Sequence, residues 1–393
     1  MAETYRILTL NPISQQGLKH FPHNYLIGNS MSDPDAILVR SQDMHSMRIP
    51  AKVKAIGRAG AGTNNIPVAE MSKRGVPVFN APGANANAVK ELVIGAMLIA
   101  ARNLVPAIRF VDKMRGDEAA FNQSVEESKK QFSGIELSHR SLGIIGLGAI
   151  GGLVADAAIK LGMHVMGFDP EITVDAAWNL PSQVKKAHSI DEILKNCEFV
   201  TLHVPVLDGT RKMLDAKRLS HMKHGAVLLN FARNEVVDED AVLGALNAKK
   251  IKYYLCDFPS ARLMGHPAAV VLPHLGASTQ EAEDNCAVMV VEQLCDYLEN
   301  GNILNAVNFP NVMMGRESPY RVGIANANVP NMVGQISTAI AQAGLNIHNM
   351  VNKSRGEMAY TLVDLDSAVP SALIKKIAAI AGVLSMRNLP LQM

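Results

Sequence analysis

The stretch from Leu142 to Asp169 constrains the fold more than any other part of this 393-residue chain. An apolar run, Leu142–Ile145, leads into the glycine turn Gly146-Leu147-Gly148-Ala149-Ile150-Gly151, and a helix-like segment then continues to Leu161. A strand, a G-x-G-x-x-G turn and a helix in this order form the context in which the glycine pattern is typical of dinucleotide binding.

Each glycine of this turn has its own expected task. The first makes the tight turn, the second lets the backbone approach a pyrophosphate, and the third permits close packing of helix and strand. Asp169 ends the next predicted strand, where its carboxylate can bind the adenosine ribose hydroxyls and would repel a 2′-phosphate. We therefore predict an NAD site formed by Gly146, Gly148, Ala149, Ile150, Gly151 and Asp169. A turn that serves only the fold is the alternative.

A series of short apolar strands begins at this turn. The strands are predicted at 142–145, 164–168, 199–203, 226–230, 252–256 and 270–272. Because they lack polar alternation and are separated by helix-length segments, we expect a parallel sheet covered on both faces. This is the doubly wound α/β arrangement, whose ligands bind beyond the carboxyl ends of the strands.

The rest of the chain predicts further domains, as its length requires. Strands at 37–40, 53–57 and 76–80, with a helix at 68–74, indicate a second α/β domain, and a long helix is predicted from 87 to about 114. A helix at 278–300 follows the doubly wound series, and the segment 308–319 is predicted to be a linker. From 320 onward, the pattern favours a small α+β unit of the split βαβ kind.

Composition excludes several function classes. The hydrophobic share of 48% and the charged share of 19% are typical of a globular protein, and a net charge of +2 without a basic run argues against nucleic-acid binding. No secretory signal pattern or long uncharged apolar run is present, so we expect no membrane association and a cytoplasmic location. Cys197, Cys256, Cys286 and Cys295 stand singly without zinc spacing, which predicts reduced thiols and no metal site.

Three polar pieces stand at the ends of predicted strands: His203-Val204-Pro205, Asn230-Phe231-Ala232-Arg233-Asn234-Glu235 and Pro273-His274-Leu275-Gly276-Ala277-Ser278. Together with the glycine turn they resemble the D-isomer-specific 2-hydroxyacid dehydrogenases over essentially the whole chain. The last piece and the C-terminal part resemble, in particular, the members that act on 3-phospho-D-glycerate. The resemblance implies an NAD-binding Rossmann domain at 91–279, a flavodoxin-like substrate-binding domain at 1–90 and 280–310, and an ACT-like regulatory domain at 319–393.

The same resemblance assigns catalytic roles to Arg233 and His274. A planar guanidinium can bind a 2-hydroxy carboxylate bidentately, and an imidazole can exchange the hydroxyl proton while hydride leaves C2 for NAD. The resemblance also places Phe231, Ala232, Asp257 and Gly276 along the cofactor, with Asp257 at the nicotinamide carboxamide.

Structural roles are the alternatives for these residues. Arg233 could form a surface salt bridge, His274 could precede a helix, and Asp257 could simply end a strand. For His203 we favour a hydrogen-bonded strand-end role without catalytic duty.

One departure from the family concerns the partner of His274. The family usually places a glutamate between the positions matched by Asp257 and His274, but residues 258–273 contain neither Asp nor Glu. Either backbone groups position His274, or a residue from elsewhere in the fold orients it.

The loop from Arg58 to Asn65 matches the family's substrate loop, where Ala59 and Gly60 let backbone N–H groups reach the substrate carboxylate. For a phosphate on the substrate, the resemblance implies Arg40, Ser41 and Arg58, and it places Asn85 near the substrate. Ordinary exposed arginines, and helix capping by Asn85, are the alternatives.

In the C-terminal domain, Asn326, Asn328 and Asn346 match positions that bind serine across a domain dimer in related enzymes. Amide side chains suit an amino acid because they donate and accept hydrogen bonds. However, Asn326 stands where a histidine is common, and Asn331 replaces a glycine. A dimerisation module without ligand is the alternative.

Taken together, the resemblance implies NAD-dependent oxidation of 3-phospho-D-glycerate to 3-phosphohydroxypyruvate, the first step of serine biosynthesis, by a homo-oligomer that is at least a dimer. Another D-2-hydroxyacid dehydrogenase, such as a glyoxylate or hydroxypyruvate reductase, is the first alternative. A non-catalytic NAD-sensing protein is the second.

Overall fold

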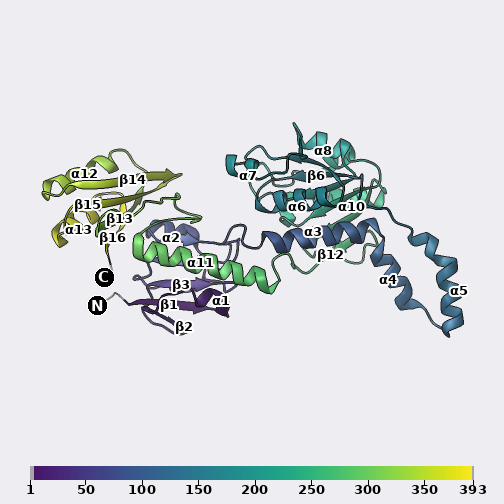
Figure 1. Cartoon of the computed structure of the whole chain (residues 1–393), viewed down its shortest axis with the longest axis horizontal. Helices are drawn as coiled ribbons and strands as arrows, with labels where there is room; N and C mark the ends of the chain where they lie inside the picture. The colour runs from purple at the N-terminus through teal and green to yellow at the C-terminus, as the bar shows by residue number, and fades with distance from the viewer. Residues whose placement is uncertain (1–3, 392–393) are drawn as a thin grey trace. The chain divides into compact units, whose positions relative to one another are not determined.

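The computed structural model describes residues 4–391, which divide into two compact units. The first combines the chain up to Asn85 with the chain from Gln280 onward, and the second is Ala86–Thr279 (Figure 1). The helix that begins at Gln280 therefore returns the chain to the unit in which it started.

The first unit contains a five-stranded parallel sheet in the order β2-β1-β3-β4-β5. Its strands are β1 (Tyr5–Leu10), β2 (Tyr25–Gly28), β3 (Ala36–Val39), β4 (Ala55–Arg58) and β5 (Val78–Phe79). Its helices are α1 (Gln15–Leu18), α2 (Val68–Lys73) and α11 (Gln280–Asn300). This strand order is flavodoxin-like, so the predicted fold of this part is confirmed.

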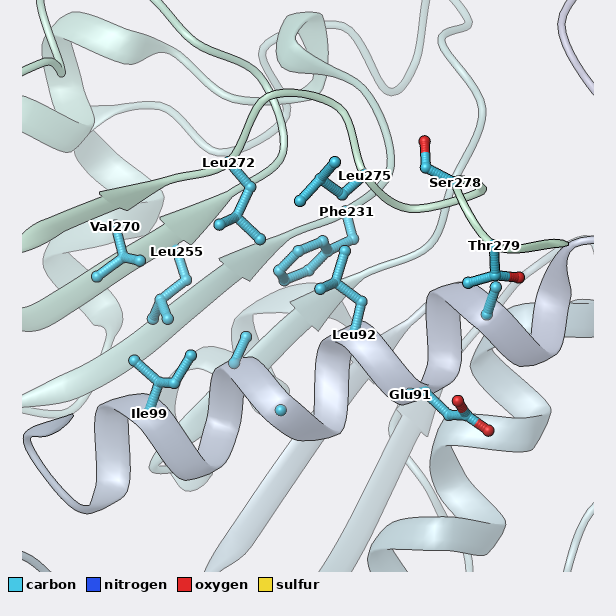
Figure 2. A pocket seen from close by; sticks show the side chains of 13 residues that line it. Glu91, Leu92, Ile99, Phe231, Leu255, Val270, Leu272, Leu275, Ser278 and Thr279 are labelled. Carbon is cyan, nitrogen blue, oxygen red and sulfur yellow. The ribbon is translucent and has the colours of Figure 1, made fainter. Parts of the chain in front are cut away.

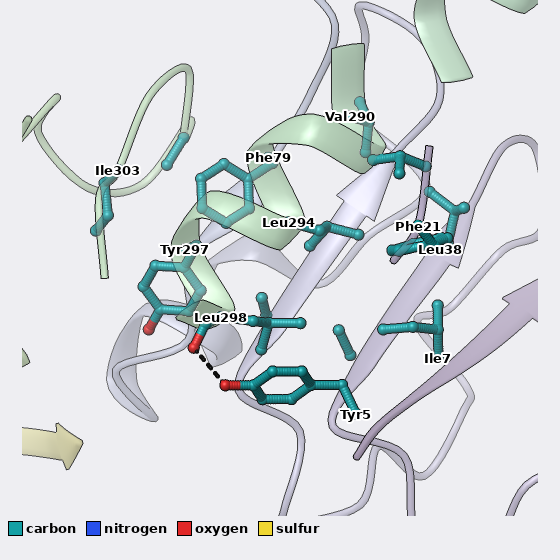
Figure 3. Close-up of a cluster of buried hydrophobic side chains, with 14 of the residues drawn as sticks. Tyr5, Ile7, Phe21, Leu38, Phe79, Val290, Leu294, Tyr297, Leu298 and Ile303 are labelled. Carbon is teal, nitrogen blue, oxygen red and sulfur yellow. Dashed lines mark hydrogen bonds between the residues drawn. The ribbon is translucent and has the colours of Figure 1, made fainter. Parts of the chain in front are cut away.

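Helix α11 covers one face of that sheet. A Cβ on Gly57 in β4 would lie 2.5 Å from Val290 and 2.9 Å from Leu294, so the glycine permits the close approach of helix and strand. Figure 3 shows the apolar cluster beneath α11, in which the Tyr5 hydroxyl donates a 3.0 Å hydrogen bond to the Leu298 carbonyl.

The second unit contains a seven-stranded parallel sheet in the order β12-β11-β10-β9-β6-β7-β8. The strands are β6 (Ser141–Ile145), β7 (His164–Phe168), β8 (Lys185–Lys186), β9 (Phe199–Leu202), β10 (Ala226–Asn230), β11 (Ile251–Cys256) and β12 (Ala269–Val271). Apolar clusters cover both faces of the sheet and include residues of the helices α3 (Ala86–Ala101), α6 (Ala149–Lys160), α8 (Ile190–Asn196), α9 (Ala216–His221) and α10 (Glu239–Asn247). A short helix, α7 (Val174–Trp178), connects β7 and β8. The doubly wound prediction is confirmed, and each strand predicted for it is present.

The long helix predicted from residue 87 was wrong. It is divided into α3 and α4 (Leu104–Lys113), which meet at 65° because Asn103 adopts a left-handed conformation (φ 52°). The Asn103 side chain donates to the carbonyls of Phe132 and Ser133, which fixes the bend. Helix α3 is packed against the sheet, whereas α4 and α5 (Glu118–Ser128) have no buried residue and extend away from it, before the short turn Lys129–Phe132 (Figure 1).

No single helix of residues 4–391 is long and apolar enough to cross a membrane. The bent pair α3 and α4 passes such a test only by its joint length and composition, and α3 belongs to the core of the second unit.

The C-terminal part of the first unit is a four-stranded antiparallel sheet in the order β14-β15-β13-β16. Its elements are β13 (Tyr320–Ala327), α12 (Met332–Gln342), β14 (Ile347–Arg355), β15 (Met358–Leu365), α13 (Ser371–Ala378) and β16 (Val383–Pro390). The small α+β unit is therefore confirmed. Asn331, which stands where a glycine is usual, adopts the left-handed conformation (φ 66°) that asparagine tolerates.

The linker predicted at 308–319 was wrong. Phe309, Val312 and Met314 are buried in the cluster beneath α11, and Val312 exchanges two 2.8 Å backbone hydrogen bonds with Ile303. Prolines and weak periodicity here mark an irregular but packed segment.

Three arginines join the C-terminal sheet to the end of α11. Their side chains donate to the last four carbonyls of the helix, which have no partner within it. The bonds run from Arg387 to Tyr297 (2.9 Å) and Leu298 (2.6 Å), from Arg316 to Glu299 (2.9 Å), and from Arg321 to Asn300 (3.2 Å). Cations are favourable at this end of the helix dipole, so the same contacts cap the helix and dock the C-terminal sheet.

Candidate active site

The glycine turn has the geometry that its sequence predicts. Gly146 has a φ of 93°, and a Cβ there would lie 2.4 Å from the carbonyl oxygen of His203. A Cβ on Gly151 would lie 2.0 Å from the Gly146 carbonyl oxygen, so this position needs glycine for helix packing. At Gly148, the residue before α6, a Cβ would meet nothing within 4 Å. The open space before Ala149 and Ile150 therefore fits a pyrophosphate at the helix N-terminus.

Asp169 is held in place by the turn that it follows. Its carboxylate accepts hydrogen bonds from the backbone N–H of Leu147 at 2.8 Å and of Glu171 at 2.9 Å. Because each carboxylate oxygen can accept a second hydrogen bond, Asp169 can still accept one from a ribose hydroxyl. The residues present thus fit NAD.

Arg233, Asp257 and His274 lie beyond the carboxyl ends of β10, β11 and β12. These strands are parallel neighbours, so the structure brings the three residues to one edge of the sheet. Arg233 is exposed, and its guanidinium donates a 2.7 Å bond to the Ala232 carbonyl. A cation at a ligand-binding edge can hold an anionic substrate.

Asn230 was not assigned a role from the sequence, yet it fixes the loop that carries Arg233. It is fully buried; its amide nitrogen donates to the Arg233 carbonyl at 2.9 Å, and its amide oxygen accepts from the Ala232 N–H at 3.2 Å. The signal in the sequence was an amide residue at the end of an otherwise apolar strand. The loop leaves Phe231 and Ala232 buried.

Asp257 is buried, at 2% exposure, and each of its carboxylate oxygens accepts a backbone hydrogen bond. The donors are the N–H groups of Leu275 and Gly276, both at 2.7 Å. A Cβ on Gly276 would lie 3.1 Å from the carboxylate, so a small residue suits this contact. Asp257 therefore fastens the loop that follows His274.

His274 is exposed and adopts a left-handed backbone conformation, with a φ of 60°. Its ring meets Phe258 edge-on at a centroid distance of 5.4 Å. Among residues 4–391, no side chain forms a hydrogen bond with this ring. Within the second unit, no carboxylate is hydrogen-bonded to the ring in place of the absent glutamate.

His203 has the environment of a structural residue. Its Nε2 lies 3.0 Å from the Thr201 hydroxyl, and burial lowers the pKa of its imidazole to about 3. The ring is therefore neutral near pH 7, as expected for a hydrogen-bonded residue at a strand end.

In the first unit, Arg40 follows β3 and Arg58 ends β4. The Arg40 guanidinium pairs with Glu283 of α11 at 2.5 Å, and Arg58 Nε donates to the Arg40 carbonyl at 3.1 Å. The two arginines that the sequence associates with phosphate thus belong to one network. Glu283 was not recognised in the sequence as the partner of Arg40.

Asn11 shapes the loop after β3, and the sequence reading missed it. Its side-chain oxygen accepts hydrogen bonds from the N–H of Ser41 at 3.1 Å and of Gln42 at 2.9 Å. The neighbouring loop is tied by bonds from the Ala59 N–H to the Val39 carbonyl and from the Gly60 N–H to the Arg58 carbonyl. Asn85 lies half-buried in the turn before α3.

The three C-terminal asparagines do not form one site within the chain. Asn326 is buried near the end of β13 and Asn328 follows it, whereas Asn346 precedes β14. The register pairs Asn326 with Ala359, and pairs both Ile347 and Tyr320 with Leu365. Asn346 therefore lies at the opposite end of the sheet.

An apolar groove of about 380 Å³ lies in the second unit beside α3 (Figure 2). Leu92 and Ile99 of α3 face Phe231, Leu255 and the segment after β12. Among residues 4–391, no group of three or more His, Cys, Asp or Glu side chains is placed to hold a metal ion.

Comparison with known proteins gives consistent matches. Residues 94–276 match the family described as D-isomer specific 2-hydroxyacid dehydrogenase, NAD binding domain. The chain is 32% identical over 350 residues to D-3-phosphoglycerate dehydrogenase of Haemophilus influenzae, covering 86% of this chain and 82% of that protein. It is 31% identical over 351 residues to the enzyme of the same name from Escherichia coli K12, with the same coverage.

Solved structures are similar in fold. NAD⁺-bound 3-phosphoglycerate dehydrogenase of Entamoeba histolytica matches with a TM-score of 0.59 at 24% identity, over 79% of this chain and 100% of that one. D-mandelate dehydrogenase of Rhodotorula graminis matches with a TM-score of 0.66 at 21% identity, over 80% of this chain and 100% of that one.

Proposed function

The chain belongs to the D-isomer-specific 2-hydroxyacid dehydrogenase family, and from this premise we propose that it oxidises 3-phospho-D-glycerate to 3-phosphohydroxypyruvate, the first step of serine biosynthesis. It is an NAD-dependent dehydrogenase with a doubly wound NAD-binding domain. The observation that carries the proposal is the gathering of Arg233, Asp257 and His274 at one sheet edge that also carries the glycine turn. The cytoplasmic location expected from the sequence stays a prediction.

Arg233 is proposed to bind the substrate carboxylate and to polarise the oxygen on C2. A guanidinium presents parallel N–H donors that match a carboxylate, and it stays charged at any working pH. His274 is proposed to take the proton of the C2 hydroxyl, because its exposed imidazole can act as a base near neutral pH. The Gly146–Gly151 turn, Asp169 and the 231–233 loop would hold NAD, which would supply the acceptor for the hydride on C2.

Arg40, Ser41 and Arg58 are proposed to bind the substrate phosphate, with the Ala59–Gly60 backbone and Asn85 contributing to the carboxylate end. Arg40 already pairs with Glu283, which fixes the guanidinium, and a guanidinium has five N–H donors, so Arg40 can bind the phosphate through its remaining N–H groups.

A steady-state NADH assay with 3-phosphoglycerate, glycerate and lactate tests this proposal. We expect kcat/KM to be highest for 3-phosphoglycerate, and the preference over glycerate to fall at least tenfold in Arg40→Ala. Lys73→Ala removes the same charge from the exposed end of α2 and should leave the preference unchanged. Equal rates with phosphorylated and unphosphorylated acids would refute the assignment.

We also propose a homodimer formed by the NAD-binding domains. The exposed helices α4 and α5 carry apolar side chains, Leu104, Ile108, Val111, Phe121 and Val125, which are between 37% and 58% exposed. Several large apolar side chains exposed on two successive helices are typical of an interface. Light scattering should give at least twice the mass of 42.3 kDa, and Ile108→Glu should lower it. A wild-type monomer would contradict the proposal.

For the C-terminal domain we propose an L-serine effector site shared by two copies. Asn326 and Asn328 lie at the end of the sheet opposite to Asn346, so these residues can meet only across a dimer of the domain. Calorimetry should show binding of L-serine but not D-serine, and Asn346→Ala should abolish it. Absence of both binding and a rate effect would leave dimerisation as the domain's role.

A further inference from the structure

The family's glutamate is absent, and the structure points to a different way of positioning the acid/base histidine. We propose that Asp257 positions His274, and that it acts through the backbone of the following loop instead of through the imidazole ring. Asp257 is here a positioning residue, beyond the cofactor contact that the family resemblance implies. The inference rests on the proposed role of His274 as acid/base.

The carboxylate of Asp257 is anchored on the sheet side. Asp257 directly follows β11, and its N–H donates to the carbonyl of Asn230 at 3.3 Å. The Leu272 N–H donates to the Cys256 carbonyl at 2.8 Å, which holds β12 beside β11 up to the start of the histidine loop. The buried carboxylate thus has a fixed place from which to bind that loop.

On the loop side, both carboxylate oxygens are used. They accept the N–H groups of the two residues after His274, at 2.7 Å each. Hydrogen bonds to an ionised acceptor are short and strong, and two of them in parallel fix direction as well as distance. The Ser278 N–H donates to the Leu275 carbonyl at 2.9 Å, which closes the loop before α11.

His274 needs such a restraint because of its backbone conformation. A φ of 60° is disfavoured for any residue with a Cβ, so the loop would relax if its contacts were removed. Relaxation would turn the Cα–Cβ bond and move the imidazole away from the strand ends. Among residues 4–391 the ring forms no hydrogen bond with a side chain and meets Phe258 edge-on, so its position depends chiefly on the backbone.

A double-mutant cycle tests the proposal. Asp257→Ala should lower kcat about 10- to 100-fold, the range typical of lost supporting contacts, with little change in the substrate KM. In a His274→Ala background, Asp257→Ala should lower kcat very little further. A residue that acts through His274 has no effect on kcat once His274 has been removed. If the two fold-losses in kcat multiply in the double variant, the proposal is overturned. Asp257 would then act independently of His274, as a contact to the cofactor.

Three further measurements keep the outcome interpretable. In Asp257→Asn the amide oxygen can still accept one N–H, but the amide nitrogen is a donor that faces the other N–H, so kcat should fall as well; an unchanged kcat would overturn the proposal. In Gly276→Ala the added Cβ would lie 3.1 Å from the Asp257 carboxylate, which disturbs the contact without changing the charge, so kcat should fall here too. Asp208→Ala, at an exposed position of the same unit, removes an equal charge and should be silent.

The ring signals of His274 in NMR spectra of the free enzyme separate this inference from the proposed substrate. They should shift or broaden in Asp257→Ala but not in Asp208→Ala, whatever acid the enzyme oxidises. Unchanged signals would overturn the positioning role. Failure of wild-type turnover with 3-phosphoglycerate would instead refute the proposed function, and the cycle would then be run with the acid that reacts.

Discussion

Substitution of Arg321 by methionine should destabilise the first unit strongly. Arg321 and Asp364 form a bidentate pair at 2.6 and 2.8 Å, and both side chains have 0% exposure. Removing one partner of a buried pair leaves an uncompensated charge, which costs about 3–5 kcal/mol. Arg321 also donates to the carbonyls of Asn300, Met314 and Gly315, so the upper part of that range is expected.

The pH dependence should reverse sign in this variant. Burial raises the pKa of Asp364, but the hydrogen bonds from Arg321 and from the Glu317 N–H outweigh it, and the net pKa is lowered. Because the pKa is lower in the folded state, Asp364 stabilises the protein at pH values above its unfolded pKa of about 3.9. That stabilisation is lost as the pH falls through the folded pKa. Without Arg321, burial, the largest of the causes, is opposed only by the Glu317 N–H and the charge of Arg316, so the pKa of Asp364 should rise. The variant should then become more stable on acidification, as the carboxyl takes up its proton.

Hydrogen exchange measured by mass spectrometry is the suitable assay, because the one tryptophan, Trp178, belongs to the second unit and cannot report on this one. Protection at the end of α11 and in β13 should fall by a factor of at least 100, while the second unit keeps its protection. Lys353→Met, at an exposed position of β14, is the matched control. Unchanged protection near Asn300 would refute the reasoning, as would a variant that loses stability on acidification as the wild type does.

Three further predictions concern the second unit. Gly151→Ala should weaken NADH binding more than tenfold in a fluorescence titration, because its Cβ would lie 2.0 Å from the Gly146 carbonyl oxygen, whereas Gly152→Ala has room and should bind normally. Asp169→Ala should reduce the preference for NADH over NADPH at least tenfold in the same titration, since the carboxylate that repels a 2′-phosphate is gone; an unchanged ratio would contradict this. Because the pKa of His203 is lowered in the folded state, the unfolded protein binds a proton at this residue below pH 6.5 while the folded protein does not. Urea unfolding followed by circular dichroism should therefore show stability falling by up to about 1.4 kcal/mol per pH unit from 6.5 towards 3, and His203→Gln should remove that contribution.

The strands of the second unit were predictable because buried parallel strands appear as apolar runs between helices. The rule that ligands lie beyond their carboxyl ends also predicted that Arg233, Asp257 and His274 would meet. In contrast, β1 and β2 were not predicted, although β1 (Tyr5–Leu10) is an interior strand that pairs with both β2 and β3. Its sequence, YRILTL, has polar residues among the apolar ones and so lacks the continuous apolar run that marks the later strands.

What the sequence could not reveal depends on backbone conformation and on distant partners. The left-handed conformation of His274 has no local signature, and that of Asn103, a residue type that tolerates it, was not recognised although it breaks a helix. The arginines that cap α11 stand in segments that read as a linker and as ordinary strands, and Arg387 lies 90 positions from Tyr297. Such contacts follow from the packing of whole domains, not from any periodicity.

The Arg321 variant has a consequence beyond stability, because α11 connects two features of the first unit. Its last carbonyls are held by the three arginines, and Glu283 in its first turn holds Arg40. If loosening the C-terminal end lets α11 shift on the sheet, Arg40 loses its fixed partner, and the KM for 3-phosphoglycerate should rise. The dissociation constant for NADH should stay the same, since the glycine turn belongs to the other unit. Because Glu283→Gln breaks only the Arg40 contact, it should raise KM without the loss of protection at Asn300. A rise in KM in Glu283→Gln but not in Arg321→Met would show that α11 holds its place without the C-terminal domain.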